Sequence, residues 1–376
     1  MIKGTSEPQP GTRRLGQTAR SAAWLALAIA LGFVGGTQWG RFAAGGSNRG
    51  PDQLSQPTPT PRRAIDHVVI VIKENHSYDN YFASRENLPG PPLPHCASRV
   101  TQDHCQYVEA DLPAYYRYLA AFGSGDRYFV DVDGPSWPNQ MMMIAAQSPL
   151  DHNPTVLSGP QWGCPFTCYD FPTIGDALGT AGLSWRNYGE AVFDPFRAIR
   201  HLASDDRHNP PTSQFFEDLA THQLPAVSWV RPSYPESEHP GYDVREGQWW
   251  TVNIVNAVMR SPYWPTTVIL VVWDDAGTAG DHVVPPVLER EPGGKPFRYG
   301  LRAPFLVVSP YTPEGFVSHR VLSHVSTLKF IETLFHLPPL TQRDADANGL
   351  EDFFDLSRPA RPPLLLSPDC GQPTCP

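Results

Sequence analysis

Polar side chains stand at the ends of two apolar runs in this sequence. Glu74, Asn75 and His76 follow the run HVVIVI and a single lysine, and Asp274 and Asp275 follow TTVILVVW. Such continuous β-branched runs are typical of parallel strands that are covered on both faces. Carboxylates and amides at the ends of two core strands can converge at one edge of a sheet, where they suit a hard divalent cation. The alternative interpretation is a pair of hydrated turns.

A hydroxyl that could work with these carboxylates lies in the segment DGPSWPNQMMMIAAQS, residues 133–148. Gly134 and Pro135 predict a turn, and the residues after Ser136 can begin a helix. A hydroxyl at that point meets backbone N–H groups and the positive end of the helix dipole, which favour a phosphate. The commoner role of serine there is to cap the helix. Position alone therefore favours the cap.

The elements that must position these residues alternate between strands and helices. Strands are expected at residues 67–72, 224–232, 266–273 and 302–311, and helices at residues 173–182, 212–222, 247–261 and 324–335. This alternation predicts an α/β fold, a three-layer α/β/α sandwich with a mainly parallel central sheet. In such sheets ligands bind outside the carboxyl ends of the strands, which is where Glu74 and Asp274 fall.

Length, charge and composition limit the classes of protein that fit. A chain of 376 residues is long enough for one large α/β domain or two smaller ones. The formal charge of -9 argues against a nucleic-acid binder, which normally carries a basic patch. The 42 prolines are about twice the average usage, and they predict long ordered loops on a rigid scaffold.

Residues 1–44 have the features of an export segment. Arg13, Arg14 and Arg20 precede AAWLALAIALGFV, an uncharged apolar run of 13 residues. That length is typical of a signal-peptide core and short for a spanning helix, although an uncleaved membrane anchor stays open. Residues 45–63 are rich in Pro, Ser, Gln and Thr and predict a flexible linker. We therefore expect a catalytic domain over residues 64–376, outside the cytoplasm.

The six cysteines form three short-range couples. An even number of cysteines in an exported chain indicates disulfides. Zinc binding would need C-x2-C spacing with histidine partners, which this sequence lacks. The expected bonds are Cys96–Cys105, Cys164–Cys168 and Cys370–Cys375.

Four segments resemble a bacterial phosphoesterase family, the one that holds secreted phospholipases C and a group of acid phosphatases within the alkaline-phosphatase-like superfamily. They are IDHVVIVIKENHSYDNYF, GPSWPNQ, VVWDDAGTAGDHVVPP and RAPFLVVSPYTPEGFVSHRVLSHVSTLKFIE, and the tail LPPLTQRDADANGLEDFFD is similar too. Together they run from about residue 65 to 355 in the family's order. The resemblance implies an alkaline-phosphatase-like fold.

The resemblance also implies a metal site. Glu74, Asn75, Asp274 and Asp275 match positions that ligate a metal ion in the family. We therefore expect one divalent metal ion, whose identity the motifs do not specify. Within residues 344–355, DADANGLEDFFD resembles a calcium loop, but Asp355 stands where a bidentate Glu is usual.

The catalytic residues are likewise implied by the resemblance. Ser136 matches the nucleophilic Ser or Thr, and His239 matches a histidine that lies close to the phosphoryl group. His282 and His324 fall in family-like segments, and Asn139 belongs to the motif of Ser136, so these three are further catalytic candidates. A serine needs a metal or a base to lose its proton. A phosphoserine intermediate is expected.

The expected partners are a phosphate-ester small molecule or a phospholipid headgroup. The chain is shorter than typical phospholipases C of the family, which favours a compact phosphatase-like enzyme. Gln140 stands where the family usually has Arg, so one cationic contact to phosphate is missing. Two alternatives remain. One is a sulfatase, since SWPNQ approaches S-x-P-x-R, although Gln140 argues against it. The other is a non-catalytic exported binding protein. The presence of Glu74–Asn75, Ser136 and Asp274–Asp275 argues against it.

Overall fold

The computed structural model describes residues 64–85, 93–100, 104–153, 169–189, 194–290 and 296–367. The predicted export segment (1–44) and linker (45–63) lie outside the described residues. So do two of the predicted disulfides, Cys164–Cys168 and Cys370–Cys375. Within the described ranges, no helix is both long and apolar enough to cross a membrane.

A seven-stranded sheet forms the centre of the fold, in the order β10-β2-β9-β6-β1-β5-β4. Its strands are β1 (His67–Lys73), β2 (Gly123–Gly125), β4 (Trp185–Tyr188), β5 (Val227–Val230), β6 (Thr267–Trp273), β9 (Phe305–Val308) and β10 (Phe316–Ser318). Strand β1 pairs in parallel with β5 and β6, and β4 pairs in parallel with β5. Strand β9 runs antiparallel to β6 and β2. The predicted mainly parallel sheet is confirmed.

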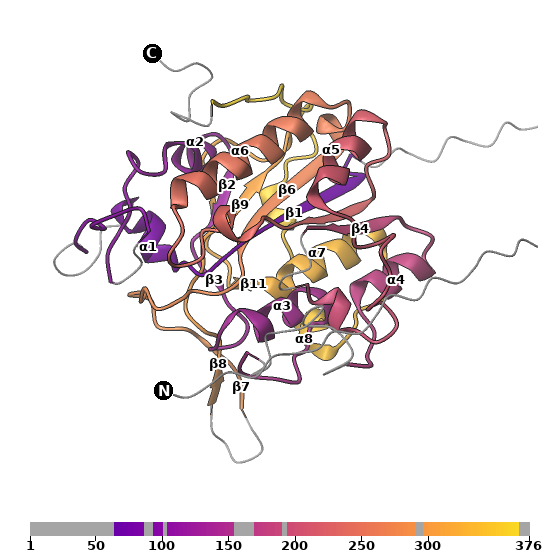
Figure 1. The fold of residues 1–376 in the computed structure, drawn as a ribbon, viewed down its shortest axis with the longest axis horizontal. Coiled ribbons are helices and arrows are strands. Elements are labelled where there is room, and N and C mark those ends of the chain that lie inside the picture. Colours follow the sequence, from indigo (N-terminus) through magenta and orange to yellow (C-terminus); the bar gives the residue numbers. More distant parts are fainter. Residues whose placement is uncertain are drawn as a thin grey trace, which may run out of the picture. The chain divides into compact units, whose positions relative to one another are not determined.

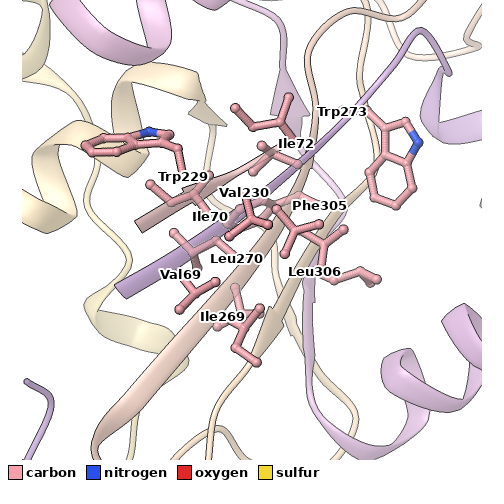
Figure 2. Close-up of a cluster of buried hydrophobic side chains, with 14 of the residues drawn as sticks. Val69, Ile70, Ile72, Trp229, Val230, Ile269, Leu270, Trp273, Phe305 and Leu306 are labelled. Atoms are coloured by element: carbon pink, nitrogen blue, oxygen red, sulfur yellow. The ribbon is translucent and has the colours of Figure 1, made fainter. Parts of the chain in front are cut away.

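The central strands β1 and β6 are buried over almost their whole length, and apolar residues fill their middles, as a sheet with helices on both faces requires. Strands β1 and β6 pair residue for residue, from His67 opposite Thr267 to Lys73 opposite Trp273. Their side chains pack with those of β5 and β9 in one buried cluster (Figure 2). This register has a direct consequence for the site, because it brings the residues after the two strands side by side.

The helices lie in two layers on opposite sides of the sheet (Figure 1). One layer contains α2 (Pro113–Ala121), α5 (Thr212–Ala220) and α6 (Val244–Arg260). The other contains α3 (Ser136–Ala145), α4 (Ile174–Thr180), α7 (His324–Phe335) and α8 (Gln342–Asp346). Helix α3 packs against α7 and α4, and α6 packs against α2 and α5. The predicted α/β/α sandwich is therefore confirmed.

Short elements complete the described chain. They are α1 (Tyr78–Phe82), the pair β3 (Tyr128–Phe129) and β11 (Leu322–Ser323), and the hairpin β7 (Val287–Arg290) and β8 (Pro296–Arg298). All four predicted strands and all four predicted helices form, with ends that differ by a few residues. The predicted Cys96–Cys105 disulfide is present. The acidic segment 344–355 contains the end of α8 and a short 3-10 helix (Glu351–Phe353), and the Asp344 side chain accepts from the N–H of the N-cap residue Thr341.

Removing the Cys96–Cys105 disulfide should destabilise the fold. The bond joins residues only 9 positions apart, and loop-closure entropy for so short a loop corresponds to about 2–3 kcal/mol. We expect Cys96→Ser/Cys105→Ser to lower the free energy of unfolding by this amount, measured by denaturant titration without reductant. An unchanged midpoint and slope would contradict this expectation.

Candidate active site

The carboxyl ends of β1 and β6 bring the predicted metal ligands together. Since Lys73 lies opposite Trp273, the next residues, Glu74 and Asp274, are neighbours, and the N–H of Asp274 donates to the carbonyl of Lys73 (2.9 Å). The N–H of Asn75 donates to Asp274 Oδ1 (3.3 Å). Asn75 has a φ of 46°, a left-handed conformation that asparagine tolerates better than most residues. That turn aims its side chain back toward the carboxylates.

Ser136 faces the predicted metal ligands and does not cap its helix. It is the first residue of α3, and Pro135 occupies the N-cap position. The side-chain cap comes from Asn153, whose Oδ1 accepts from the N–H of Trp137 (3.0 Å). The Ser136 hydroxyl donates to Asp275 Oδ2 (2.9 Å). With the Asn75 amide nitrogen turned inward, that nitrogen donates to Ser136 Oγ (3.1 Å) and to Asp274 Oδ1 (3.1 Å). The expectation from position alone, a capping serine, is wrong.

Three buried carboxylates give the site an excess of negative charge. Burial raises the pKa of Glu74 well above its usual value, and the charges of Asp274 and Asp275 raise it further. Burial, followed by the charge of Asp274, raises the pKa of Asp275 to about 8. Desolvated carboxylates at this density are costly unless a positive charge compensates them. The carboxylate oxygens, joined by the Asn75 oxygen when that amide is turned the other way, therefore suit a divalent cation.

Gln140 links two of these carboxylates to an arginine. Its amide nitrogen donates to Asp274 Oδ2 (2.7 Å) and to Glu74 Oε1 (3.4 Å). Its amide oxygen accepts a hydrogen bond from the guanidinium of Arg231, which follows β5 directly. Both side chains are buried. A buried guanidinium thus lies beside Gln140, and sequence analysis did not find it because nothing in the sequence marks Arg231 as a partner.

Asn139 holds the turn that presents Ser136. Its side-chain oxygen accepts from the N–H of Val132 (2.9 Å), and its amide nitrogen donates to the carbonyls of Val132, Gly134 and Pro135 (3.0, 3.1 and 3.2 Å). All four hydrogen-bonding contacts are to the backbone of the preceding turn. This geometry positions the hydroxyl, and a direct role in the chemistry stays a prediction.

His324 lies behind Asp274. Its Nε2 is 2.8 Å from the carbonyl of Asp274, and its Nδ1 is 2.8 Å from the hydroxyl of Tyr128. Because a carbonyl only accepts, Nε2 carries the proton and Nδ1 accepts from the tyrosine. Burial lowers the pKa of His324 to about 4. With both nitrogens engaged, this imidazole fixes the backbone of Asp274, and its predicted catalytic role remains untested.

His282 belongs to a second polar cluster. Its Nδ1 lies 2.8 Å from Asp79 Oδ2, and its N–H donates to the same oxygen (2.7 Å). Ligand atoms of Asp79, Asp281 and His282 lie within 4.8 Å of one another, a spacing that a metal ion could bridge. However, the buried guanidinium of Arg302 is 2.9 Å from both carboxylates. Arg302 already compensates the two charges, so a cation at this cluster would compete with a buried guanidinium.

His239 is half-buried and packs against Tyr234. The two rings are 5.4 Å apart. Burial, followed by the charge of Glu74, raises the pKa of Tyr234 to about 12. The Nδ1 atom of His239 is 3.0 Å from the carbonyl of Pro240. Because a carbonyl only accepts, Nδ1 is the donor in this contact. The other ring nitrogen, Nε2, is then the one that can contact a ligand.

Comparison with known proteins identifies the family. Residues 94–338 match the model of the Phosphoesterase family. The chain belongs to that family. It is 29% identical over 299 residues to phospholipase C B of Mycobacterium tuberculosis, covering 68% of this chain and 57% of that protein. It is 24% identical over 455 residues to the non-hemolytic phospholipase C of Burkholderia pseudomallei, covering 85% and 65%.

The phosphoesterase chain thus spans less than two thirds of the length of these relatives. Among solved structures, a protein in the alkaline phosphatase superfamily from Vibrio parahaemolyticus aligns with a TM-score of 0.48 and 14% identity, covering 78% of this chain and 72% of that one.

Replacing Gln140 should measure how much its link to Arg231 stabilises the fold. Gln140→Leu keeps the approximate volume but leaves buried polar groups of Asp274 and Arg231 without this partner, which costs about 1–3 kcal/mol. The exposed Gln342, whose amide reaches Asp346, is the matched control, and Gln342→Leu should change stability by less than about 0.5 kcal/mol. Equal effects of the two variants in denaturant unfolding would show that Gln140 is not a structural link.

Proposed function

We propose that this chain is an exported, metal-dependent phosphoesterase that hydrolyses phosphate esters through a phosphoserine intermediate. The observation that supports this most directly is the Ser136 hydroxyl, buried and 2.9 Å from Asp275 among an excess of carboxylates. A serine that only stabilised its helix would face the backbone N–H groups of the first turn. This one faces the carboxyl ends of two core strands instead.

Glu74, Asn75, Asp274 and Asp275 would hold one divalent cation. When bound, such an ion supplies positive charge that stabilises a phosphoryl group and lowers the pKa of a nearby hydroxyl. The chain contributes the fixed geometry of the ligands. Gln140 and His324 orient Asp274 from two sides, and the backbone N–H of Gly277 donates to Asp275 Oδ1 (2.6 Å).

The chain's own residues account for two successive displacements at phosphorus. In the first, Ser136 Oγ attacks in line, its proton passes to Asp275 Oδ2, and the bond from phosphorus to the ester oxygen breaks. His239, protonated at Nε2, gives that proton to the departing oxygen. In the second, a water attacks the phosphoserine and gives a proton back to His239, while the bond from phosphorus to Ser136 Oγ breaks and Asp275 Oδ2 returns its proton to that oxygen.

The start of helix α3 favours the phosphoryl group at this point. Ser136 is the first residue of a 10-residue helix, so the positive end of the helix dipole lies beside its hydroxyl. Arg231, which the sequence motif does not predict, adds a buried guanidinium that reaches Gln140. Both features add positive potential where negative charge develops on the phosphoryl oxygens.

The substrates we propose are phosphate esters that are either small molecules or phospholipid headgroups. Several relatives bear the name phospholipase C, which supports a diester. We also propose that the enzyme acts outside the cytoplasm, on the basis of the sequence of residues 1–44. Assays with nitrophenyl phosphate, its phosphodiester and phosphatidylcholine, each with and without chelator, would distinguish these substrates.

Ser136→Ala should lose almost all turnover. Removing a covalent nucleophile leaves only residual metal-assisted hydrolysis, so the rate should fall by about three orders of magnitude or more. The variant should also fail to retain label from a phosphorylated substrate after an acid quench. The control is Ser148→Ala, past the other end of α3, where the hydroxyl donates only to the carbonyl of Leu150. Near-normal turnover by Ser136→Ala would mean that water is the nucleophile.

Asp274→Ala should abolish activity and reduce the bound metal while the fold survives. The carboxylate is one of the proposed ligands, and its loss also removes the acceptor for Gln140. Elemental analysis of purified protein gives the metal content, and circular dichroism verifies the fold. Full metal occupancy in this variant would refute the assignment of the ligand set.

A further inference from the structure

A buried ion pair that sequence analysis did not single out lies beneath the proposed site. The Nζ of Lys73 is 3.2 Å from Glu238 Oε1, and both side chains are completely buried. Lys73 is the last residue of β1, directly before Glu74, and Glu238 directly precedes His239. The pair therefore joins the residue before a proposed metal ligand to the residue before the proposed general acid.

The carboxylate of Glu238 is surrounded by donors. The hydroxyl of Tyr115 donates to Oε1 (2.5 Å), and the hydroxyl of Tyr81 and the indole N–H of Trp273 donate to Oε2 (2.6 and 3.0 Å). A buried ion pair is stable only where additional hydrogen bonds satisfy its remaining lone pairs and protons. Here each carboxylate oxygen has at least two partners, which fixes the orientation of the side chain.

Strand β1 is hydrogen-bonded to the backbone of the loop that carries His239. The Lys73 ammonium donates to the carbonyl of Glu236 (2.5 Å), and the N–H of Glu74 donates to the carbonyl of Ser237 (2.9 Å). The Nε2 of His76 is 2.8 Å from the carbonyl of Glu238. Three consecutive loop carbonyls are thus bound by residues at the end of β1. This explains the position of His76, which contacts the loop and not the carboxylates.

The loop is held in a conformation that its sequence does not favour. Glu238 has a φ of 71°, a left-handed conformation that costs a non-glycine residue about 1–3 kcal/mol. Helix α6 makes room for it with Gly247, where an added Cβ would lie 2.2 Å from Glu238 Cγ. Such strain persists only where the surroundings over-determine the conformation. The residue that follows the strained position is His239.

We propose that the Lys73–Glu238 pair is a positioning device that sets the imidazole of His239 relative to the phosphoryl group. The proposal rests on the proposed function, because it assigns His239 the role of proton donor to the leaving oxygen. General acid catalysis requires hydrogen-bond reach to that oxygen, and a shift of about 1 Å can cost two orders of magnitude in rate. The ion pair fixes the peptide immediately before the imidazole.

The test is Glu238→Gln, which preserves volume and removes the charge. A nitrophenolate leaves without a proton, whereas an alkoxide needs one. If His239 is mispositioned, kcat for an alkyl phosphate ester should fall at least tenfold more than kcat for the matching nitrophenyl ester. His239→Ala should show the same selectivity, and Glu238→Gln/His239→Ala should be no worse than His239→Ala alone, because residues that act as a unit are not additive.

Asp218→Asn is the matched control. Asp218 is a buried carboxylate beside β4 that pairs with Arg186 and accepts from the hydroxyl of Tyr188 (2.5 Å). Asp218→Asn should lower the melting temperature as Glu238→Gln does, but it should change kcat for the alkyl ester and for the nitrophenyl ester equally. Tyr81→Phe is the second variant, used if Glu238→Gln does not fold. It removes one hydrogen bond to Glu238 and should give the same selectivity, only smaller.

Two different results would overturn the proposal. If His239→Ala shows no preference between the esters, His239 is not the proton donor, and the assigned role and the positioning device fail together. If His239→Ala shows the preference but Glu238→Gln slows both esters equally, or the two changes add, the positioning device fails and the proposed function stands.

Discussion

The in-register parallel pairing of β1 and β6 is the constraint on which the site depends. Each strand is buried on both faces, so its backbone has one stable position. The last pair of the two strands, Lys73 with Trp273, therefore fixes the positions of the residues that follow. Glu74 and Asp274 are adjacent because they are the first residues beyond that pair. A slip of one residue would turn every side chain of a strand to the opposite face and would separate the two carboxylates.

Buried charges around this sheet edge are compensated in all but one place. Glu238 is paired with Lys73, and Asp79 is paired with Arg302. Glu74, Asp274 and Asp275 lie near Arg231, which Gln140 links to Asp274, and burial still raises the pKa of each carboxyl. Three carboxyls near one guanidinium leave an excess of negative charge, which is the observation that favours the proposed cation.

The sequence predicts the fold well where an element depends on its own residues. The continuous apolar runs of β1 and β6 specify buried strands, and the apolar periodicity of α7 specifies a helix. Strand β2 is different, because its sequence Gly123–Gly125 has no strand propensity and forms only through pairing with β9 and β10. Strand β4 was missed as well, because its four residues combine two polar side chains with aromatics.

The candidate site could be predicted only in part, for a related reason. The motifs predicted which side chains could act as ligands or as a nucleophile. They could not predict which distant residues contact those side chains in the folded chain. Arg231 and Gln140 are 91 positions apart, and Lys73 and Glu238 are 165 apart (238 − 73), so no local pattern connects either pair. The start of α3 illustrates the same limit. With Pro135 at the N-cap, the side-chain cap comes from Asn153, 16 positions beyond Trp137, from whose N–H it accepts, and the Ser136 hydroxyl turns to the carboxylates. Local rules that fail in this way mark the places where function, and not the stability of one element, determines the structure.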